Sequence, residues 1–133
     1  MRPRITVVDD SPEFLELIRD VLEAEHDVVT YNVIRSVAEI AASAPDLLLI
    51  DLHTGGPAGG LTGWEILAIA RSHPDLQSVP AIVCSADLAT LREDRVRLLA
   101  HGDVQLIAKP FDIHAFEQTI DRTLRLAGTS RRG

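Results

Sequence analysis

Short runs of apolar, mostly β-branched residues alternate along the chain with stretches in which apolar residues recur every three or four positions. The runs lie at residues 5–8, 28–31, 47–50, 81–84 and 104–107, and most are almost continuously apolar. Continuous runs of this length are typical of strands covered on both faces, whereas half-exposed strands alternate. Strands that alternate with helices predict an α/β fold with a parallel sheet and right-handed crossovers.

The intervening stretches predict five amphipathic helices, each with one apolar stripe. The stripes are Phe14, Leu17, Ile18, Val21 and Leu22; Val37, Ile40, Ala41 and Ala44; Ile66, Leu67 and Ala70; Leu88, Leu91, Leu98 and Leu99; and Ile113, Phe116, Ile120 and Leu124. Capping signals precede four of them, at Ser11-Pro12, Ser36 with Glu39, Thr62 with Glu65, and Asp112.

Composition narrows the class of protein. A chain of 133 residues predicts one domain over 1–133, with a core at about 4–126 and a short disordered tail at 128–133. The net charge of −7 argues against a broad nucleic-acid-binding face. One cysteine, Cys84, excludes an internal disulfide. The short apolar runs and the missing leader predict no membrane span and a cytoplasmic location.

Polar residues follow the predicted strands. Asp9 and Asp10 come after the first strand, Asp51 after the third, Ser85 after the fourth and Lys109 after the fifth. Ligands of open parallel sheets bind beyond the carboxyl ends of the strands, so we expect these side chains to meet at one edge.

The chemistry of such a group is that of phosphoryl transfer. Two carboxylates at ~4 Å repel by about 4 kcal/mol at an effective dielectric of ~20, so among three either some stay protonated or a cation lies between them. Oxygen ligands favour Mg²⁺, which commonly uses one or two carboxylates and a phosphate. Lys109 suits a phosphate oxygen and Ser85 adds a hydroxyl donor. A carboxylate can itself be the nucleophile and become an aspartyl phosphate.

With these residues in this order, the chain from Arg4 to Leu126 resembles the receiver domains of two-component response regulators. The resemblance implies a flavodoxin-like, five-stranded parallel sheet in the order 2-1-3-4-5, with five helices on both faces. It also implies a phosphoryl group taken from a sensor histidine kinase or a phosphotransfer protein with Mg²⁺. The domain would be a signalling switch or relay with slow self-dephosphorylation, and not an enzyme on an external substrate.

The same resemblance assigns roles to individual residues. Asp51 would accept the phosphoryl group. Asp10 would bind Mg²⁺ directly and Asp9 largely through water, while Asp51 and the backbone carbonyl of His53 would complete the protein ligands.

Ser85 and Lys109 would hold the phosphoryl oxygens. Phosphorylation would draw Ser85 inward and shift the face formed by the fourth helix, the fifth strand and the fifth helix. That face is also the expected place for a homodimer. The output partner is unknown, and it is expected to be a protein and not DNA or a membrane.

Two features depart from the family pattern, the loop after Asp51 and Leu106, whereas His53 and Asp87 stand at positions that flank the attacking water in the family. The loop over residues 53–65 is about four residues longer than usual, and its glycines are more typical of a lid than of a phosphate cradle. Leu106 stands where many receivers carry an aromatic residue that moves with the switch hydroxyl. His53 and Asp87 flank the expected path of the attacking water, so we expect them to set the lifetime of the phosphoryl group.

Alternatives remain for the whole chain. A degenerate receiver, acting as an interaction module without phosphorylation, would share the fold. A phosphatase with an aspartate nucleophile needs two acids two residues apart on the first strand, and Asp9-Asp10-Ser11 lacks that spacing. The chain is compatible with a stand-alone regulator and with a receiver excised from a longer protein.

Alternatives also remain for single residues. Asp9 and Asp10 would otherwise cap the first helix, and Ser85 the fourth. Trp64 is either a packing residue or a partner contact. The histidines without ligand spacing, His26, His73, His101 and His114, are expected at the surface.

Overall fold

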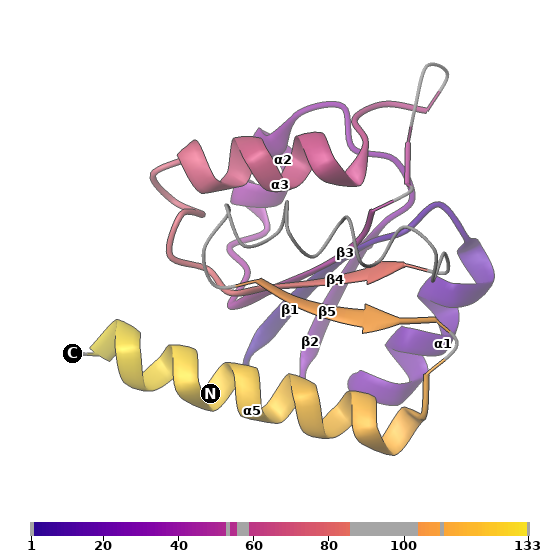
Figure 1. Cartoon of the computed structure of the whole chain (residues 1–133), viewed down its shortest axis with the longest axis vertical. Helices are drawn as coiled ribbons and strands as arrows, with labels where there is room; N and C mark the ends of the chain where they lie inside the picture. The colour runs from indigo at the N-terminus through magenta and orange to yellow at the C-terminus, as the bar shows by residue number, and fades with distance from the viewer. Residues whose placement is uncertain (1, 53, 56–58, 86–103, 110, 133) are drawn as a thin grey trace.

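The computed structural model describes residues 2–52, 54–55, 59–85, 104–109 and 111–132, the last five of them as backbone only (Figure 1). The elements are β1 (Arg4–Val8), α1 (Pro12–Leu22), β2 (Asp27–Tyr31), α2 (Val37–Ala42), β3 (Leu47–Asp51), α3 (Gly63–Ser72), β4 (Ala81–Ser85), β5 (Val104–Ala108) and α5 (Ile113–Arg132). The helix predicted around residues 88–99 lies outside the described residues.

All the strands belong to one parallel sheet in the order β2-β1-β3-β4-β5. This order confirms the predicted flavodoxin-like topology. The chain steps outward from β1 to β2 and then crosses back to β3, so β1 and β3 are neighbours. Their carboxyl ends therefore lie side by side at the point where the strand order reverses.

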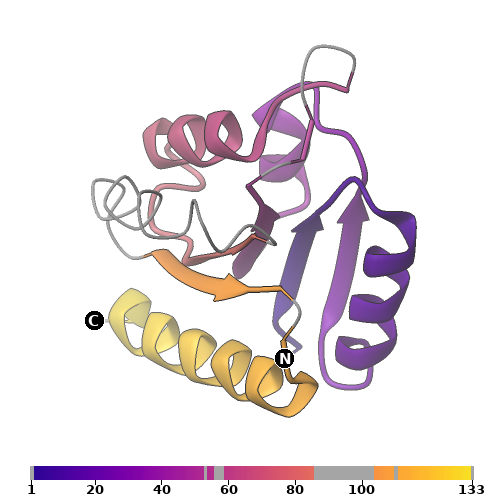
Figure 2. The ribbon, with the colours of Figure 1, turned by 45° about the vertical axis from the view of Figure 1, so that its right-hand side comes forward.

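Helices cover both faces of the sheet, with α2 and α3 on one side and α1 and α5 on the other (Figures 1 and 2). Successive residues of a strand point to opposite faces. In β3, Leu48 and Ile50 therefore pack in the cluster with α2 and α3, whereas Leu47 and Leu49 pack in the cluster with α1 and α5. Burial on both faces is the reason for the continuous apolar runs.

The position of a strand in the sheet decides how polar it is. In the interior, β4 is buried throughout and β1 and β3 over four of their five residues. The edge strands β2 and β5 are only partly buried. An edge strand has a neighbour on one side only, which leaves more of its surface in water.

The predicted caps are confirmed. Ser11 Oγ accepts a hydrogen bond from the Phe14 N–H at 3.2 Å, with Pro12 as the first residue of α1. Complete capping boxes start α2 at Ser36 and α3 at Thr62. Each supplies side-chain acceptors for N–H groups that have no partner inside the helix.

Asp112 has the same role before α5, because its Oδ1 accepts from the Ala115 N–H at 3.0 Å. All four caps predicted from the sequence, at Ser11, Ser36, Thr62 and Asp112, are therefore confirmed.

Two expectations about helix faces and ends are wrong. The buried ridge of α1 is Leu15, Ile18 and Leu22, while Leu17 is 46% exposed. Ala44 does not continue α2, which ends at Ala42, and has a positive φ of 49°. The residue before a proline disfavours the helical region, and Pro45 follows Ala44.

The expected tail differs as well, because α5 runs to Arg132, so residues 128–132 continue the helix. Extending an existing helix by one residue needs far less ordering than starting one.

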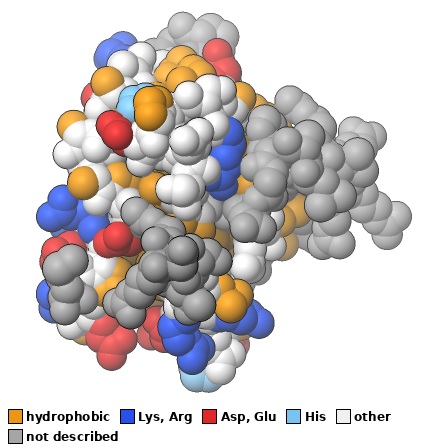
Figure 3. Space-filling model, turned by 90° about the vertical axis from the view of Figure 1, so that its left-hand side faces the viewer, with side chains coloured by type: hydrophobic (Ala, Val, Ile, Leu, Met, Phe, Trp, Pro, Cys, Tyr) orange, Lys and Arg blue, Asp and Glu red, His pale blue; other side chains and the backbone are white. Residues whose placement is uncertain are grey.

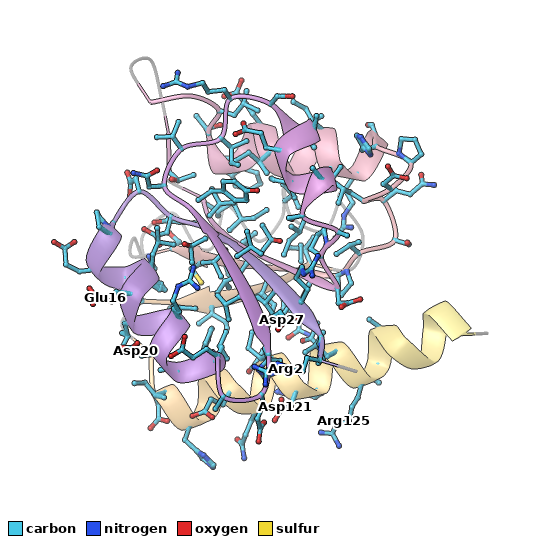
Figure 4. The ribbon with its side chains drawn as sticks, turned by 180° about the vertical axis from the view of Figure 1, so that it is seen from behind. Arg2, Glu16, Asp20, Asp27, Asp121 and Arg125 are labelled. Carbon is cyan, nitrogen blue, oxygen red and sulfur yellow. The ribbon has the colours of Figure 1, made fainter. Side chains whose placement is uncertain are left out.

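His26 is a further correction, since it is buried and not at the surface. Its Nδ1 donates to the Leu22 carbonyl at 3.0 Å, an oxygen that also accepts the backbone N–H of His26 at 3.0 Å. Arg2 covers the same turn by donating to the His26 carbonyl at 2.9 Å and pairing with Asp27 at 3.2 Å. Figure 4 labels Arg2, Asp27 and, on α5, Asp121, whose Oδ1 lies 3.8 Å from His26 Nε2.

On the face shown in Figure 3, charged side chains of both signs are interspersed with apolar ones. Among the helices that the structure describes, none combines the length and apolar character needed to span a bilayer.

Candidate functional site

Three carboxylates meet where the strand order reverses. Asp9 and Asp10 follow β1, and Asp51 is the last residue of β3. One carboxylate oxygen from each lies within 4.8 Å of the others. Asp9 is buried, Asp51 is partly buried and Asp10 is exposed, so this acidic cluster opens to solvent on one side. The structure therefore brings together the three acids predicted from the strand ends.

Lys109 enters the acidic cluster from the end of β5. Its Nζ lies 2.6 Å from Asp9 Oδ2 and 3.2 Å from Asp51 Oδ2. The backbone N–H of Lys109 donates to the Ser85 carbonyl at 2.8 Å, which ties the start of the β5–α5 connection to β4. Lys109 is the only lysine in the sequence; the other twelve basic residues are arginines. The sequence therefore places its one lysine side chain at the acidic cluster.

Burial and charge oppose each other in this group. Burial raises the pKa of the Asp9 carboxyl above its usual range, although the hydrogen bonds from Lys109 and Ser11 partly oppose that rise. Burial alone would lower the pKa of Lys109, but its hydrogen bond to Asp9 and the charges of Asp51 and Asp9 outweigh that effect and raise it. The ammonium thus stays charged and is the counter-ion of the cluster.

Asp9 also shapes the backbone at the start of α1. Its Oδ1 accepts from the Ser11 N–H at 2.9 Å, while its Oδ2 faces Lys109. The N-cap itself is Ser11. The capping role considered as the alternative for Asp9 therefore belongs to Ser11, and Asp9 orders the turn before the helix through one oxygen while the other contacts Lys109.

Ser85 ends β4 next to the acidic cluster and is fully buried. The residue before it, Cys84, pairs in register with Asp51. Burial raises the pKa of the Cys84 thiol to about 12, so it stays protonated and packs as an apolar group. His53 and Asp87, also predicted to serve this site, lie outside the described residues.

Gly63, the first residue of α3, packs directly against the backbone of Asp51. A Cβ at Gly63 would lie 2.3 Å from the Asp51 carbonyl oxygen and 2.6 Å from Leu52 Cα. Only a residue without a side chain allows the helix to begin this close to the end of β3. The loop after Asp51 therefore ends at Gly63, against the backbone of Asp51 itself.

One neighbour of the cluster is not predicted by the sequence. The ring of Phe14 lies under Lys109, with Nζ 3.8 Å from the ring centroid. The spacing of Phe14 marks it as an apolar helix residue, and nothing in the spacing indicates a contact with a residue from the other end of the chain.

The donor set of the acidic cluster fits Mg²⁺. The groups are carboxylate oxygens, which this hard cation prefers over nitrogen or sulfur. The exposed side at Asp10 leaves room for the waters that Mg²⁺ usually keeps. Asp9 and Asp51 already pair with a cation, the Lys109 ammonium, so part of the negative charge of the cluster is offset within the chain.

Comparison with known proteins agrees with this geometry. The response regulator receiver domain family matches residues 5–121. The sensor histidine kinase TmoS of Ectopseudomonas mendocina is 28% identical over 98% of this chain and 13% of its own length. The phosphate regulon transcriptional regulatory protein PhoB of Rhizobium meliloti (strain 1021) is 32% identical over 96% of this chain and 54% of its own length.

Among solved structures, NtrX from Brucella abortus superimposes with a TM-score of 0.79 at 26% identity, covering 99% of this chain and 29% of NtrX. This chain thus spans about half or less of the length of these relatives. The match covers the part that carries the sheet, the acidic cluster and Lys109. The chain belongs to the receiver domains of two-component response regulators, a family of signalling domains and not ordinary enzymes.

Proposed function

We propose that this chain accepts a phosphoryl group on Asp51 from a phosphohistidine, and that the aspartyl phosphate is the signal. The observation that carries the proposal is the position of Asp51 in the acidic cluster, with Lys109 Nζ 3.2 Å from its Oδ2. Asp51 is the acid at the carboxyl end of the central strand β3, and it is only partly buried, so a donor has access to it.

In the proposed reaction an Asp51 carboxylate oxygen attacks phosphorus. The new bond is O–P, and the bond that breaks is N–P of the donor histidine, whose ring nitrogen keeps the electron pair. Lys109 and the hydroxyl of Ser85 would contact the phosphoryl oxygens. Catalysis of this kind depends on positioning and charge stabilisation more than on covalent help from the protein.

Asp9, Asp10, Asp51 and the backbone carbonyl of His53 are proposed to hold Mg²⁺. The bound ion would offset the negative charge that the carboxylates and the phosphoryl oxygens bring together. Lys109 would then be released from Asp9 and directed to the phosphoryl group, because the two cations compete for the same oxygens.

The test is incubation with acetyl phosphate and Mg²⁺, followed by intact-mass measurement. We expect a mass gain of one phosphoryl group that disappears in Asp51→Asn and persists in Asp20→Asn, an exposed acid of α1. A phosphoryl group found on another residue would refute the assignment of Asp51.

A native chain that takes up nothing, from acetyl phosphate or from histidine kinases, would instead favour the degenerate receiver. Leu106 and the long loop are the features that agree with that alternative.

The lifetime of the aspartyl phosphate is the second part of the proposal. His53 and Asp87 are proposed to flank the attacking water and to set a slow self-dephosphorylation. If the double substitution of both residues by alanine leaves the decay rate unchanged, this part is wrong.

The proposed partners are a sensor histidine kinase or a phosphotransfer protein as donor and a protein as output, in the cytoplasm. TmoS, by its name, is such a kinase, and PhoB a transcriptional regulatory protein. The output and homodimer surface is proposed on the predicted fourth helix, β5 and α5. Chemical crosslinking before and after treatment with acetyl phosphate tests whether self-association depends on phosphorylation.

A further inference from the structure

The structure places three groups of the described residues against the ammonium of Lys109, and one of them is aromatic. Two are the carboxylates of Asp9 and Asp51, at 2.6 and 3.2 Å. The third is the face of Phe14, whose centroid lies 3.8 Å from Nζ. A cation this close to an aromatic face is attracted by the negative face of the ring quadrupole, and the attraction is larger where water is excluded.

The Phe14 ring is held from two sides. The backbone N–H of Phe14 donates to Ser11 Oγ, so the ring projects from the capped first turn of α1. On its other side Phe111 packs against it, with the centroids 5.9 Å apart and the rings tilted by 60°.

Phe111 in turn stacks on Phe116 of α5, with the ring centroids 4.7 Å apart and the ring planes at 17°. Phe116 is 1% exposed and belongs to the core. These are all three phenylalanines of the chain, and we call them the phenylalanine ladder. The ladder connects the site to rigid parts of two helices, so the ring under Lys109 has little freedom.

We propose that Phe14 is a positioning residue for Lys109. The lysine side chain is flexible and four carbons long, and its ammonium must stay beside Asp51 to meet a phosphoryl group. The ring blocks the space on one side of Nζ and attracts the charge, which keeps the ammonium at the acidic cluster even when Asp9 is taken by another cation. This inference deepens the proposed function and depends on it for the role of Lys109 in phosphoryl transfer.

The first experiment measures position without any phosphoryl transfer. Because Lys109 is the only lysine, ¹³C-labelled lysine gives a single set of side-chain NMR signals. In metal-free protein we expect the ε-methylene protons to be shifted upfield by the Phe14 ring, with the fast transverse ¹³C relaxation of an ordered side chain. In Phe14→Leu the upfield shift should disappear and the relaxation should become that of a mobile chain.

Leu17→Ala is the matched control, because Leu17 lies on the same helix, is exposed and belongs to neither core cluster. It should leave the lysine signals unchanged. If Phe14→Leu leaves both the shift and the relaxation of the lysine as they are in the native chain, the proposal is wrong.

The second experiment separates the charge of the ring from its bulk. Phe14 also packs against the α1/α5 core cluster, so Phe14→Leu lowers stability for reasons unrelated to Lys109. Replacing Phe14 with mono-, di- and trifluorophenylalanine keeps the shape and progressively weakens the negative face. A cation–π contact of about 0.5–2 kcal/mol corresponds to roughly 2- to 30-fold in rate.

We expect the rate of phosphorylation by acetyl phosphate to fall stepwise within that range along the series, with unchanged melting temperature. Equal rates across the series would overturn the attraction between ring and ammonium.

The two experiments fail separately from the proposed function. If the native chain takes up no phosphoryl group, the proposed function is wrong, and the lysine signals still decide whether Phe14 positions Lys109. If Asp51 is phosphorylated and the lysine signals are the same in Phe14→Leu as in the native chain, only the positioning role of Phe14 is refuted.

Discussion

Lys109 Nζ lies closer to Asp9 than to Asp51, at 2.6 Å against 3.2 Å. The lysine therefore neutralises mainly the carboxylate that is not the proposed acceptor. Asp9 is buried and Asp51 is more accessible, so the ammonium compensates the acid that water compensates least. A cation that binds Asp9 Oδ2 therefore competes with Lys109.

Replacing Lys109 by methionine should destabilise the metal-free protein and strengthen the binding of Mg²⁺. The variant leaves Asp9 buried without its counter-ion. Breaking a buried pair costs about 3–5 kcal/mol, and the partial exposure of Lys109 reduces this to about 1–3 kcal/mol. Urea unfolding in EDTA measures the first effect, and calorimetric titration with MgCl₂ measures the second.

Arg35→Met, which removes a basic residue from an exposed position, should change stability by less than about 0.5 kcal/mol. A Lys109→Met protein as stable as the native chain in EDTA, or one that binds Mg²⁺ more weakly, would contradict the competition between the two cations.

Asp9→Asn should stabilise the metal-free protein at neutral pH. The pKa of Asp9 in the folded state is raised above its ordinary value of 3.8. At a pH between 3.8 and that raised pKa, the native state therefore holds a proton that the unfolded state has released. The free energy of unfolding therefore rises as the pH falls through the folded pKa, and the gain is complete below 3.8.

Asparagine keeps a hydrogen-bonding side chain without the charge, so the variant should lack this part of the pH dependence. Urea unfolding of both proteins in EDTA over a series of pH values gives the difference curve. Asp20→Asn, at an exposed site, should follow the native chain. Added Mg²⁺ should reverse the order of the two stabilities, because the ion favours the carboxylate.

Gly63→Ala should destabilise the fold and displace the end of β3, where Asp51 lies. The new Cβ would meet backbone atoms of Asp51 and Leu52 at 2.3–2.9 Å, and backbone at the end of a central strand has little room to move. Overpacking of this kind costs about 1–3 kcal/mol, occasionally more. Chemical denaturation measures the loss, and the Asp51 amide NMR signal reports the displacement.

Gly59→Ala is the control from the same loop, because its Cβ would meet no atom of the described residues closer than 3.6 Å. It should be neutral within about 0.5 kcal/mol. Equal stabilities for the two alanine variants would show that the approach of α3 to β3 is less close than described.

Thr6→Val should cost about 1 kcal/mol through a buried hydrogen bond. Ser43 Oγ donates its proton to the Ile40 carbonyl at 2.6 Å, so in the 2.7 Å contact with Thr6 the threonine is the donor. Valine has the same shape and removes that donor. Thr123 is a buried threonine whose hydroxyl has no partner among the described residues, so Thr123→Val should be neutral or stabilising. Matching losses in the two variants would argue against the Thr6–Ser43 bond.

The sequence by itself determined the strands, most of the helix starts and the grouping of Asp9, Asp51 and Lys109. A run such as Leu47–Asp51 is apolar at nearly every position because both its faces are buried, and that property is visible along the chain. Ser36 and Thr62 are visible in the same way, since a cap and its N–H partners lie within one turn. Asp9, Asp51 and Lys109 could be grouped because parallel strands end at a common edge.

Only the tertiary structure decided which side chains touch across elements. Leu17 and Leu15 have similar helical spacing, and the angle at which α1 packs on the sheet buries one and exposes the other. His26, Gly63 and Phe14 acquire their surroundings from Leu22, Asp51 and Lys109, and the last of these pairs is far apart in the chain. Periodicity and capping are local properties, whereas such contacts depend on how packed elements are placed relative to one another, which no single segment encodes.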